Sequence, residues 1–141
     1  MFRISKSFAA VLFIVVSLIS PVGCTPGGSS LDGTQWRLTG WTVSSLNPAD
    51  FTITASFTGG QVSGSSAVNT YSGSYHLGPG AAFSLGSLAS TLMAGPEPAM
   101  RAETAYLTLL SQASSYKIAE GMLTLYDQSG NVSLIFETVN Q

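Results

Sequence analysis

Apolar and polar residues alternate along several short segments of this chain, and this alternation indicates a fold built mainly of β-strands. The clearest case is 51–57, in which every second residue is apolar, as expected for a strand with one buried face. Gly59-Gly60 follows this segment and is typical of a tight hairpin. The pattern predicts about seven or eight strands, at 34–43 (with a possible bulge at Gly40), 51–57, 61–64, 70–77, 82–88, 115–119, 122–126 and 132–139.

One segment has a different period. Between 98 and 114 the apolar residues recur every three or four positions, which predicts one amphipathic helix, and Pro98 suits its first position. The turns between strands are short and only one helix is available for a crossover, so we expect antiparallel pairing. Many short strands tend to close on themselves to hide their edges. We therefore expect an α+β, mainly antiparallel β, fold: a small cracked β-barrel with the helix packed against or into its opening.

The first 23 residues are expected to be a secretory signal peptide. Arg3 and Lys6 precede an apolar run over 8–19 that is broken only by Ser17. This run is much shorter than the roughly 20 residues that span a bilayer as a helix, and the order of basic, apolar and small residues is that of a secretory signal. The alternative, a buried helix of the folded domain, is disfavoured because the run has no polar face.

Cys24, the only cysteine of the chain, follows this segment directly. Val22-Gly23-Cys24 resembles the lipobox of bacterial-type lipoproteins, in which the cysteine thiol carries a diacylglyceryl chain, although Pro21 stands where leucine is usual. Acylation there would anchor the protein in the membrane of the cell envelope, outside the cytoplasm. Thr25 in place of aspartate implies the outer membrane in a cell with two membranes. The alternative is ordinary cleavage nearby, which would leave a free thiol.

Residues 24–30 are polar and rich in Gly and Ser, as in a flexible tether. We therefore divide the chain into the lipoprotein signal peptide (1–23), this tether (24–30) and one domain (31–141). Without the signal, three basic residues remain against seven acidic ones, a net charge of −4. Such a surface does not favour nucleic acid. One cysteine and one histidine exclude an internal disulfide, a cysteine-based zinc site and a multi-histidine metal site, and we expect no cofactor.

Few residues have a spacing that indicates catalysis. His76 is the only imidazole and is expected on the outer face of a strand, and no G-x-S-x-G motif is present. Most acids lie in predicted turns. Glu103 lies beside the apolar stripe of the predicted helix, where we expect it to accept hydrogen bonds from the backbone or a tyrosine. The chain is therefore not expected to be an enzyme, and a hydrolase that uses Glu103 or His76 is the remaining alternative. Trp36, Trp41, Tyr71 and Tyr75 could form an aromatic platform that binds a sugar or a peptide. A role in the core and at its rim is the favoured alternative for these four residues.

Several motifs, in their order and spacing, resemble the META domain (HslJ-like) family. They are 31–38, 69–75, 90–100 and 123–127, with Glu103, Leu110 and Gly130. The resemblance implies a compact β-rich domain with one helix and no established reaction. Family members often carry cysteines where this chain has Val68 and Gly95, which implies a disulfide that this chain lacks. The candidate structural or binding residues taken from these motifs are Trp36, Asn69, Tyr71, Gly73, Tyr75, Met93, Pro96 and Glu103.

The leading functional hypothesis is a non-enzymatic envelope lipoprotein, anchored at Cys24, that acts in envelope stress or integrity by binding an unknown envelope protein. The resemblance supports it, because family members are linked to stress response, antibiotic tolerance, motility and secretion. A second hypothesis is a binder of apolar ligands or a secretion chaperone, because the META fold is similar to that of pilotins, lipoproteins that bind a lipid tail or a partner helix inside a cracked barrel.

Overall fold

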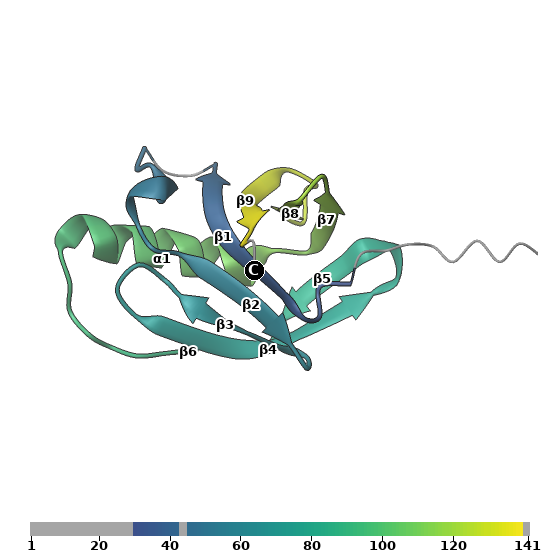
Figure 1. The fold of residues 1–141 in the computed structure, drawn as a ribbon, viewed down its shortest axis with the longest axis horizontal. Coiled ribbons are helices and arrows are strands. Elements are labelled where there is room, and N and C mark those ends of the chain that lie inside the picture. The colour runs from purple at the N-terminus through teal and green to yellow at the C-terminus, as the bar shows by residue number, and fades with distance from the viewer. Residues whose placement is uncertain (1–29, 43–44, 140–141) are drawn as a thin grey trace, which may run out of the picture.

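The structure, a computed structural model, describes residues 30–42 and 45–139 (Figure 1). The predicted signal peptide, Cys24 and the tether up to residue 29 lie outside the described residues, as does Val43. The elements of the described part are β1 (Thr34–Trp41), η1 (Pro48–Asp50), β2 (Thr54–Thr58), β3 (Gln61–Ser65), β4 (Thr70–Gly78), η2 (Pro79–Ala81), β5 (Ala82–Leu85), β6 (Ala89–Ser90), α1 (Glu97–Gln112), β7 (Ser115–Ala119), β8 (Met122–Tyr126) and β9 (Val132–Thr138).

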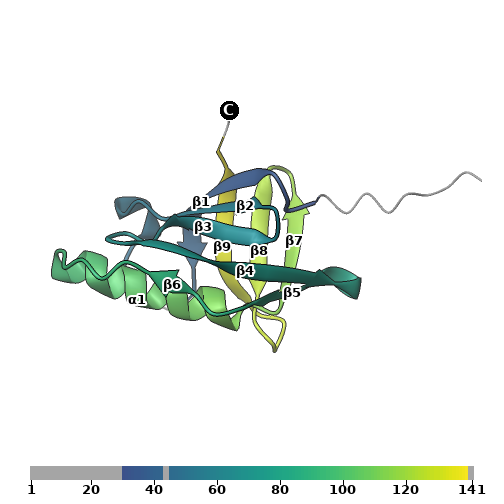
Figure 2. The same cartoon turned by 90° about the horizontal axis from the view of Figure 1, so that it is seen from below.

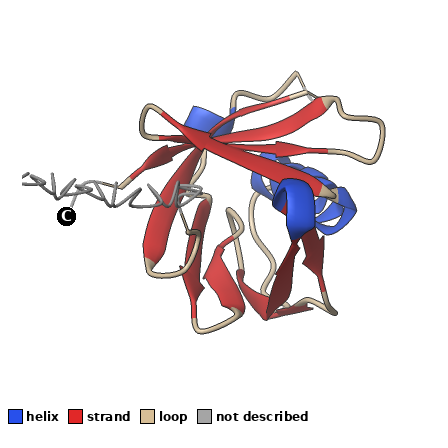
Figure 3. Cartoon of the chain, turned by 90° about the vertical axis from the view of Figure 1, so that its right-hand side faces the viewer, coloured by secondary structure: helices blue, strands red, loops and turns tan. Residues whose placement is uncertain are grey.

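Eight antiparallel strands form a closed barrel, as Figure 3 shows with the helix at one side of the ring. The order around the barrel is β3, β2, β1, β9, β8, β7, β5 and β4, and pairing of β3 with β4 closes it. The short strand β6 is an addition that pairs with β4 through Tyr71 and Ser72. The predicted mainly antiparallel barrel with one amphipathic helix is confirmed. Closure leaves few free edges for pairing with other chains.

The pairing between neighbouring barrel strands is least extensive between β5 and β7. These two strands share one residue pair, Ala82 with Ser115, together with a hydrogen bond from the Phe83 amide to the Ser114 carbonyl at 2.9 Å. The helix α1 packs against β5 and β9 at one side of the barrel (Figure 2). Its buried residues include Tyr106 and Leu110, which reach into the same core as the strands. The expected crack is therefore a narrow seam between β5 and β7 in a ring of strands that is otherwise more extensively paired.

Most strand boundaries agree with the alternation, and the differences have local causes. A register shift between Leu38 and Gly40 confirms the bulge at Gly40. The strand predicted over 82–88 stops at Leu85, because after a last hydrogen bond from the Gly86 amide to the Ser74 carbonyl the chain leaves β4 and returns to it as β6. The helix begins one residue before Pro98. The strand predicted from 51 begins at Thr54 instead, after the unpredicted turn η1.

The inward face of the barrel carries the predicted apolar residues. Trp36, Leu38, Ile53, Ala55 and Phe57 are all buried. The largest fully buried side chains lie on different elements, so one core joins both sides of the barrel and the helix. They include Phe57 of β2, Tyr106 of α1, Leu123 and Leu125 of β8, and Leu134 and Phe136 of β9.

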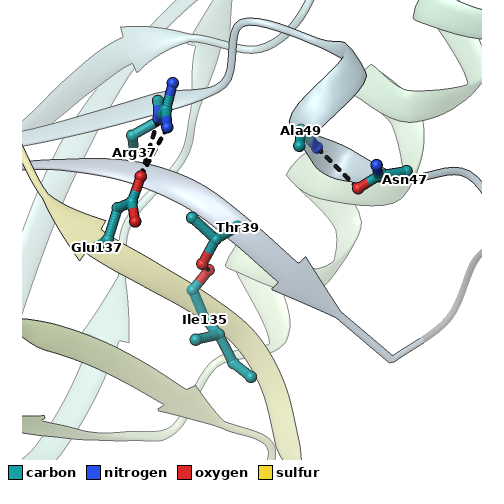
Figure 4. A network of polar contacts seen from close by, with 6 residues as sticks. All are labelled: Arg37, Thr39, Asn47, Ala49, Ile135 and Glu137. Atoms are coloured by element: carbon teal, nitrogen blue, oxygen red, sulfur yellow. Dashed lines mark hydrogen bonds and ion pairs between the residues drawn. The ribbon is translucent and has the colours of Figure 1, made fainter.

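The outer face adds little stability through charge. Arg37 on β1 and Glu137 on β9 form an ion pair of 2.7 Å, shown in Figure 4, but their side chains are 62% and 48% exposed. A solvent-exposed pair of this kind contributes between about 0.2 and 1 kcal/mol. In the same figure the side chain of Asn47 accepts a hydrogen bond from the Ala49 amide at 3.1 Å and caps η1.

No helix in the described residues is long and apolar enough to cross a membrane.

Candidate functional site

Glu103 is the buried acid of α1. It lies on the helix face that also buries Tyr106 and Leu110, and 8% of its surface is exposed. Helical spacing explains this position, because residues three and four apart share one side of a helix. A buried carboxylate is costly unless hydrogen bonds replace its water. The partners of Glu103 come from the turn between β3 and β4.

The turn over 66–69 presents three donors to this carboxylate. The Ser66 hydroxyl and the Asn69 backbone amide donate to Oε2 of Glu103 at 2.6 and 2.8 Å, and the Asn69 side-chain amide donates to Oε1 at 2.8 Å. Inside the turn, the Ser66 amide donates to the Asn69 carbonyl at 2.8 Å and Ala67 has φ 89°. A positive φ is uncommon for alanine and persists where the surroundings hold it. Glu103 thus ties the helix to this turn.

The Asn69 side chain extends the contact to the loop that leads into α1. Its Oδ1 accepts from the Met93 amide at 2.7 Å and from the Thr91 hydroxyl at 2.8 Å. Its Nδ2 donates to the Met93 carbonyl at 3.1 Å, in addition to Glu103. Every hydrogen-bonding position of the carboxamide is therefore used. We give the name buried polar network to the buried side chains of Ser66, Asn69 and Glu103 together with the two groups that Asn69 binds, the Thr91 hydroxyl and the Met93 backbone. This network holds the backbone at Met93 to the barrel.

Two tyrosine hydroxyls lie beside this network. The Tyr71 hydroxyl donates to the Thr54 carbonyl at 2.8 Å and lies 2.6 Å from the Tyr106 hydroxyl. Because each hydroxyl has one proton, Tyr106 is the donor to Tyr71. The two rings meet edge to face, with centroids 5.5 Å apart. The pair joins α1 to β4 and β2 through polar atoms inside an apolar core.

The pKa values of Glu103, Tyr71 and Tyr106 are consistent with hydrogen-bonding roles inside the protein. Burial by itself would raise the pKa of Glu103, but hydrogen bonds from Ser66, Asn69 and the Val68 backbone outweigh it and lower that pKa below its ordinary value. Glu103 is therefore a charged acceptor near neutral pH. Burial raises the pKa of Tyr71 and of Tyr106 well above the ordinary value of 10. Both hydroxyls therefore remain protonated donors.

Other candidate residues serve the core. Trp36 is buried, and its indole N–H donates to the Thr34 hydroxyl at 2.7 Å. Tyr75 packs edge to face on Phe57, with ring centroids 5.1 Å apart. Both therefore have core positions, and neither belongs to an exposed aromatic platform.

Gly73 and Pro96 mark close approaches of the chain. A Cβ atom at Gly73 would lie 2.7 Å from Cδ2 of Leu88 and 2.9 Å from the Ser87 carbonyl oxygen. Glycine therefore allows the segment after β5 to cross β4. Pro96 directly precedes α1. The structure thus unites three candidate residues, Asn69, Met93 and Glu103, in the network, with Tyr71 beside it.

The loop clamped by Asn69 presents apolar side chains to solvent. Leu92 is 96% exposed and Met93 60% exposed. Met93 also lines an open hollow of about 600 Å³, whose other lining residues include Asp50, Phe51, Val68 and Pro96. We call Leu92, Met93 and this hollow the distal surface.

Sequence reasoning did not place Ser66, Thr91 or Leu92 among the candidate residues. Ser66 is one of many serines, and nothing in the pattern distinguishes it. Thr91 and Leu92 lie within the 90–100 motif, which was the available signal. The motif does not reveal that Thr91 bonds to Asn69 or that Leu92 faces water.

The remaining titratable groups are dispersed. His76 lies on the outward face of β4, opposite Ser84 of β5, and is exposed. Along β4 it is six residues from Thr70, or about 20 Å at 3.3 Å per residue, so it lies far from Glu103. Within residues 30–42 and 45–139, no three His, Cys, Asp or Glu side chains are placed to hold a metal ion.

A comparison with protein families and with solved structures gives consistent results. The META domain family model matches residues 29–140. A protein from Burkholderia xenovorans, with a structure solved by NMR, is 26% identical with a TM-score of 0.67, over 100% of this chain and 99% of that chain. No curated protein matches the chain.

Two further solved structures share the fold. A DUF4847 family protein from Bacteroides vulgatus is 12% identical with a TM-score of 0.58, over 79% of this chain and 96% of that chain. Another protein solved by NMR is 19% identical with a TM-score of 0.53, over 75% of this chain and 89% of that chain. At these identities the likeness is one of fold alone.

Proposed function

This chain belongs to the META domain family, and from that membership we propose that it is a lipid-anchored protein of the cell envelope whose domain acts by binding a partner and not by catalysis. The anchor would be a diacylglyceryl chain on Cys24, placed outside the cytoplasm and, in a cell with two membranes, in the outer membrane. The physiological role would be in envelope stress or integrity. The domain over 31–141 would carry the binding function.

One observation carries this proposal. The buried polar network is fully engaged in holding a surface loop, and that loop exposes an apolar side chain. Asn69 uses its whole carboxamide, and both oxygens of Glu103 accept hydrogen bonds from the same turn. A general base must instead reach a proton of the substrate. Leu92 at 96% exposure is what a rigid contact surface presents.

The distance between His76 and Glu103 also argues for binding. A catalytic pair needs its side chains within hydrogen-bond reach, whereas these two groups lie at different ends of β4. Incubation of the purified protein with ester, peptide and glycan substrates should give no turnover. Turnover that disappears on Glu103→Ala or His76→Ala would contradict a purely binding role.

The anchor is tested by Cys24→Ser. This protein should move from the membrane fraction to the soluble fraction, because the acyl chains that hold it in the bilayer can no longer be attached. Cys24→Ser protein that remains with the membranes would refute the anchor. The control is Ser30→Ala, which changes a nearby hydroxyl, leaves the thiol intact and should stay with the membranes.

A second candidate function is the binding of an apolar ligand or a secreted partner, as in pilotins. An open groove of about 540 Å³ along α1 favours it, because Leu46, Met100, Ala105 and Leu109 contribute to its walls. Inside the barrel, Phe57, Tyr106 and Phe136 are fully buried in the core, so this groove is the better place for such a ligand. Native mass spectrometry after gentle purification should then show a bound lipid or peptide that is lost on Ala105→Glu.

A further inference from the structure

We propose that the distal surface docks a segment of a partner protein in which an apolar side chain lies next to a lysine or arginine. This inference rests on the proposed binding function and specifies its surface and the chemistry of its partner. It is carried by the rigid display of Leu92, the hollow that the next residue lines, the charge at Asp50 and the position of all three relative to the first described residues.

The display of Leu92 is rigid. Both the amide and the carbonyl of the next residue, Met93, bond to the Asn69 side chain, at 2.7 and 3.1 Å. The loop backbone is therefore fixed before any partner arrives, which lowers the entropy lost on docking. An apolar side chain that is 96% exposed gains free energy when a partner removes it from water.

The hollow that Met93, the residue after Leu92, helps to line receives the partner's side chain. Three separate parts of the chain form it, namely 50–52, the turn residues 67–68 and the loop and helix start over 93–96 and 98–99. Phe51, Val68 and Pro96 give it an apolar lining. An exposed leucine followed directly by a residue that lines an apolar hollow offers a partner two apolar contacts, and apolar anchors of this kind dominate many protein interfaces.

The negative charge of Asp50 favours a basic residue next to the partner's docked apolar side chain. Asp50 is the only charged residue in the lining of this hollow. Its side chain makes no hydrogen bond or ion pair within the described part of the chain. The sequence between Asp50 and Glu97 contains no Asp, Glu, Lys or Arg, so no nearby cation on those segments offsets this carboxylate. A lysine or arginine beside the docked side chain would complement it.

The distal surface lies away from the first described residues of the domain. Asp32, near the start of the described chain, accepts a hydrogen bond from the Gly59 amide at 2.6 Å at the hairpin between β2 and β3. The turn over 66–69, which holds Met93, is at the other end of β3, a strand of about 17 Å. Figure 1 shows the same relation, with the first described residues and the loop into α1 at opposite ends of the domain. A protein beyond the anchoring membrane is therefore favoured over the membrane itself.

Three labelled peptides test this proposal. Each is ten residues long with a central Leu-Phe pair, flanked by lysines in one peptide, serines in the second and glutamates in the third. Fluorescence anisotropy measures their binding to the Cys24→Ser protein, which needs no detergent. The lysine peptide should bind most tightly and the glutamate peptide least, with steps of about threefold.

Two variants with matched controls locate the site. Leu92→Ser should weaken binding of the lysine peptide by at least about tenfold, whereas Leu77→Ser, the same change at a 40% exposed leucine on β4, should leave it unaltered. Asp50→Lys should abolish the preference for the lysine peptide, and Glu120→Lys, which changes the net charge equally, should preserve it. Unchanged thermal unfolding midpoints verify that each variant is folded.

Several results would overturn the proposal. They are equal affinities for the three peptides, binding that survives Leu92→Ser, Leu92-dependent sedimentation with phosphatidylcholine vesicles, and Leu92-dependent self-association in sedimentation velocity. The third result would assign the surface to lipid and the fourth to a second copy of the chain. The anchor hypothesis and the docking hypothesis are tested by different measurements. If the Cys24→Ser protein stays with the membranes, the anchor is refuted, and the same peptide titration is then performed on the detergent-extracted chain to test docking.

Discussion

Val68 and Gly95 lie against one another, so closely that a Cβ atom placed on Gly95 would be 2.8 Å from both methyl carbons of Val68 and 3.4 Å from its Cβ. These are the two positions at which the family resemblance implies cysteines. The contact joins the turn over 66–69 to the loop before α1, the same two segments that Asn69 joins by hydrogen bonds. Packing and a buried amide thus fasten this loop in place of a disulfide.

The pair Val68→Cys and Gly95→Cys, made in a Cys24→Ser background, should form a disulfide under mild oxidation. The Cβ separation is near that of native disulfides, and closing this loop should raise the free energy of unfolding by about 3 kcal/mol. Urea unfolding with and without reductant measures the change. Gly95→Cys alone should destabilise the domain, because its side chain would overlap Val68. Two thiols that remain free after oxidation would show that the segments are further apart.

Glu103→Gln should lower the free energy of unfolding by about 2 kcal/mol. The glutamine retains one acceptor oxygen, but its NH₂ group must face a donor of Ser66 or Asn69, which leaves buried groups unsatisfied. Glu137→Gln is the matched control and should change stability by less than about 1 kcal/mol, since its ion pair is exposed. Equal effects of the two substitutions in urea titrations would contradict the internal role of Glu103.

The stability difference between wild type and Glu103→Gln should depend on pH. The folded-state pKa of Glu103 is lower than its ordinary value of 4.5, so its contribution is fully present above that value and is lost as the pH falls below it towards the folded-state pKa. The two proteins should therefore approach equal stability in acid. A difference that stays constant from neutral pH to acid would mean that the charge of Glu103 contributes nothing.

The two tyrosines should differ in their response to removal of the hydroxyl. Tyr71→Phe leaves the Tyr106 hydroxyl buried without an acceptor, whereas Tyr106→Phe leaves Tyr71 still donating to the Thr54 carbonyl. We expect Tyr71→Phe to lower the free energy of unfolding by about 2 kcal/mol and Tyr106→Phe to lower it by about 1 kcal/mol. The double variant should be no less stable than Tyr71→Phe alone. A double-mutant cycle in urea tests this order, and the reverse order would invalidate the assigned proton direction.

Gly73→Ala should destabilise the domain, because its Cβ would meet Leu88 at 2.7 Å and a backbone carbonyl at 2.9 Å. We expect a loss of about 1 to 3 kcal/mol, as for overpacking elsewhere. Gly40→Ala is the control, since its Cβ would lie 3.4 Å from Cβ and Cδ1 of Ile135, at the edge of ordinary van der Waals contact, and should be tolerated better. The thermal unfolding midpoint compares them, and a larger effect at Gly40 would argue against the close approach at Gly73.

Local chemistry explains what the sequence predicted well. Gly59 and Gly60 have φ 58° and 78°, which glycine adopts without strain, and they form the expected hairpin. The alternation in 51–57 correctly identified Ile53, Ala55 and Phe57 as inward-facing. These features depend on neighbours in the sequence, so one sequence is enough to find them.

Contacts between residues that are far apart in the sequence could not be predicted from the sequence pattern. Arg37 and Glu137 are 100 residues apart in the sequence and lie side by side, and alternation cannot specify such a pairing. The candidate site shows the same limit. The motifs single out Asn69, Met93 and Glu103, but the hydrogen bonds between them depend on how the helix packs against the turn over 66–69. The exposure of Leu92 is the opposite of what an apolar residue suggests, because the clamped loop keeps it out of the core.

Cross-linking in intact cells measures whether the membrane-tethered domain binds a protein through its distal surface. A photoreactive amino acid replaces Leu92 in the wild-type chain or, as the control, Leu77. We expect a discrete cross-linked protein from position 92 alone, joined through an apolar residue next to a lysine or arginine and identified by mass spectrometry of the purified product. The same products from positions 92 and 77, or cross-links from position 92 to lipid alone, would contradict it.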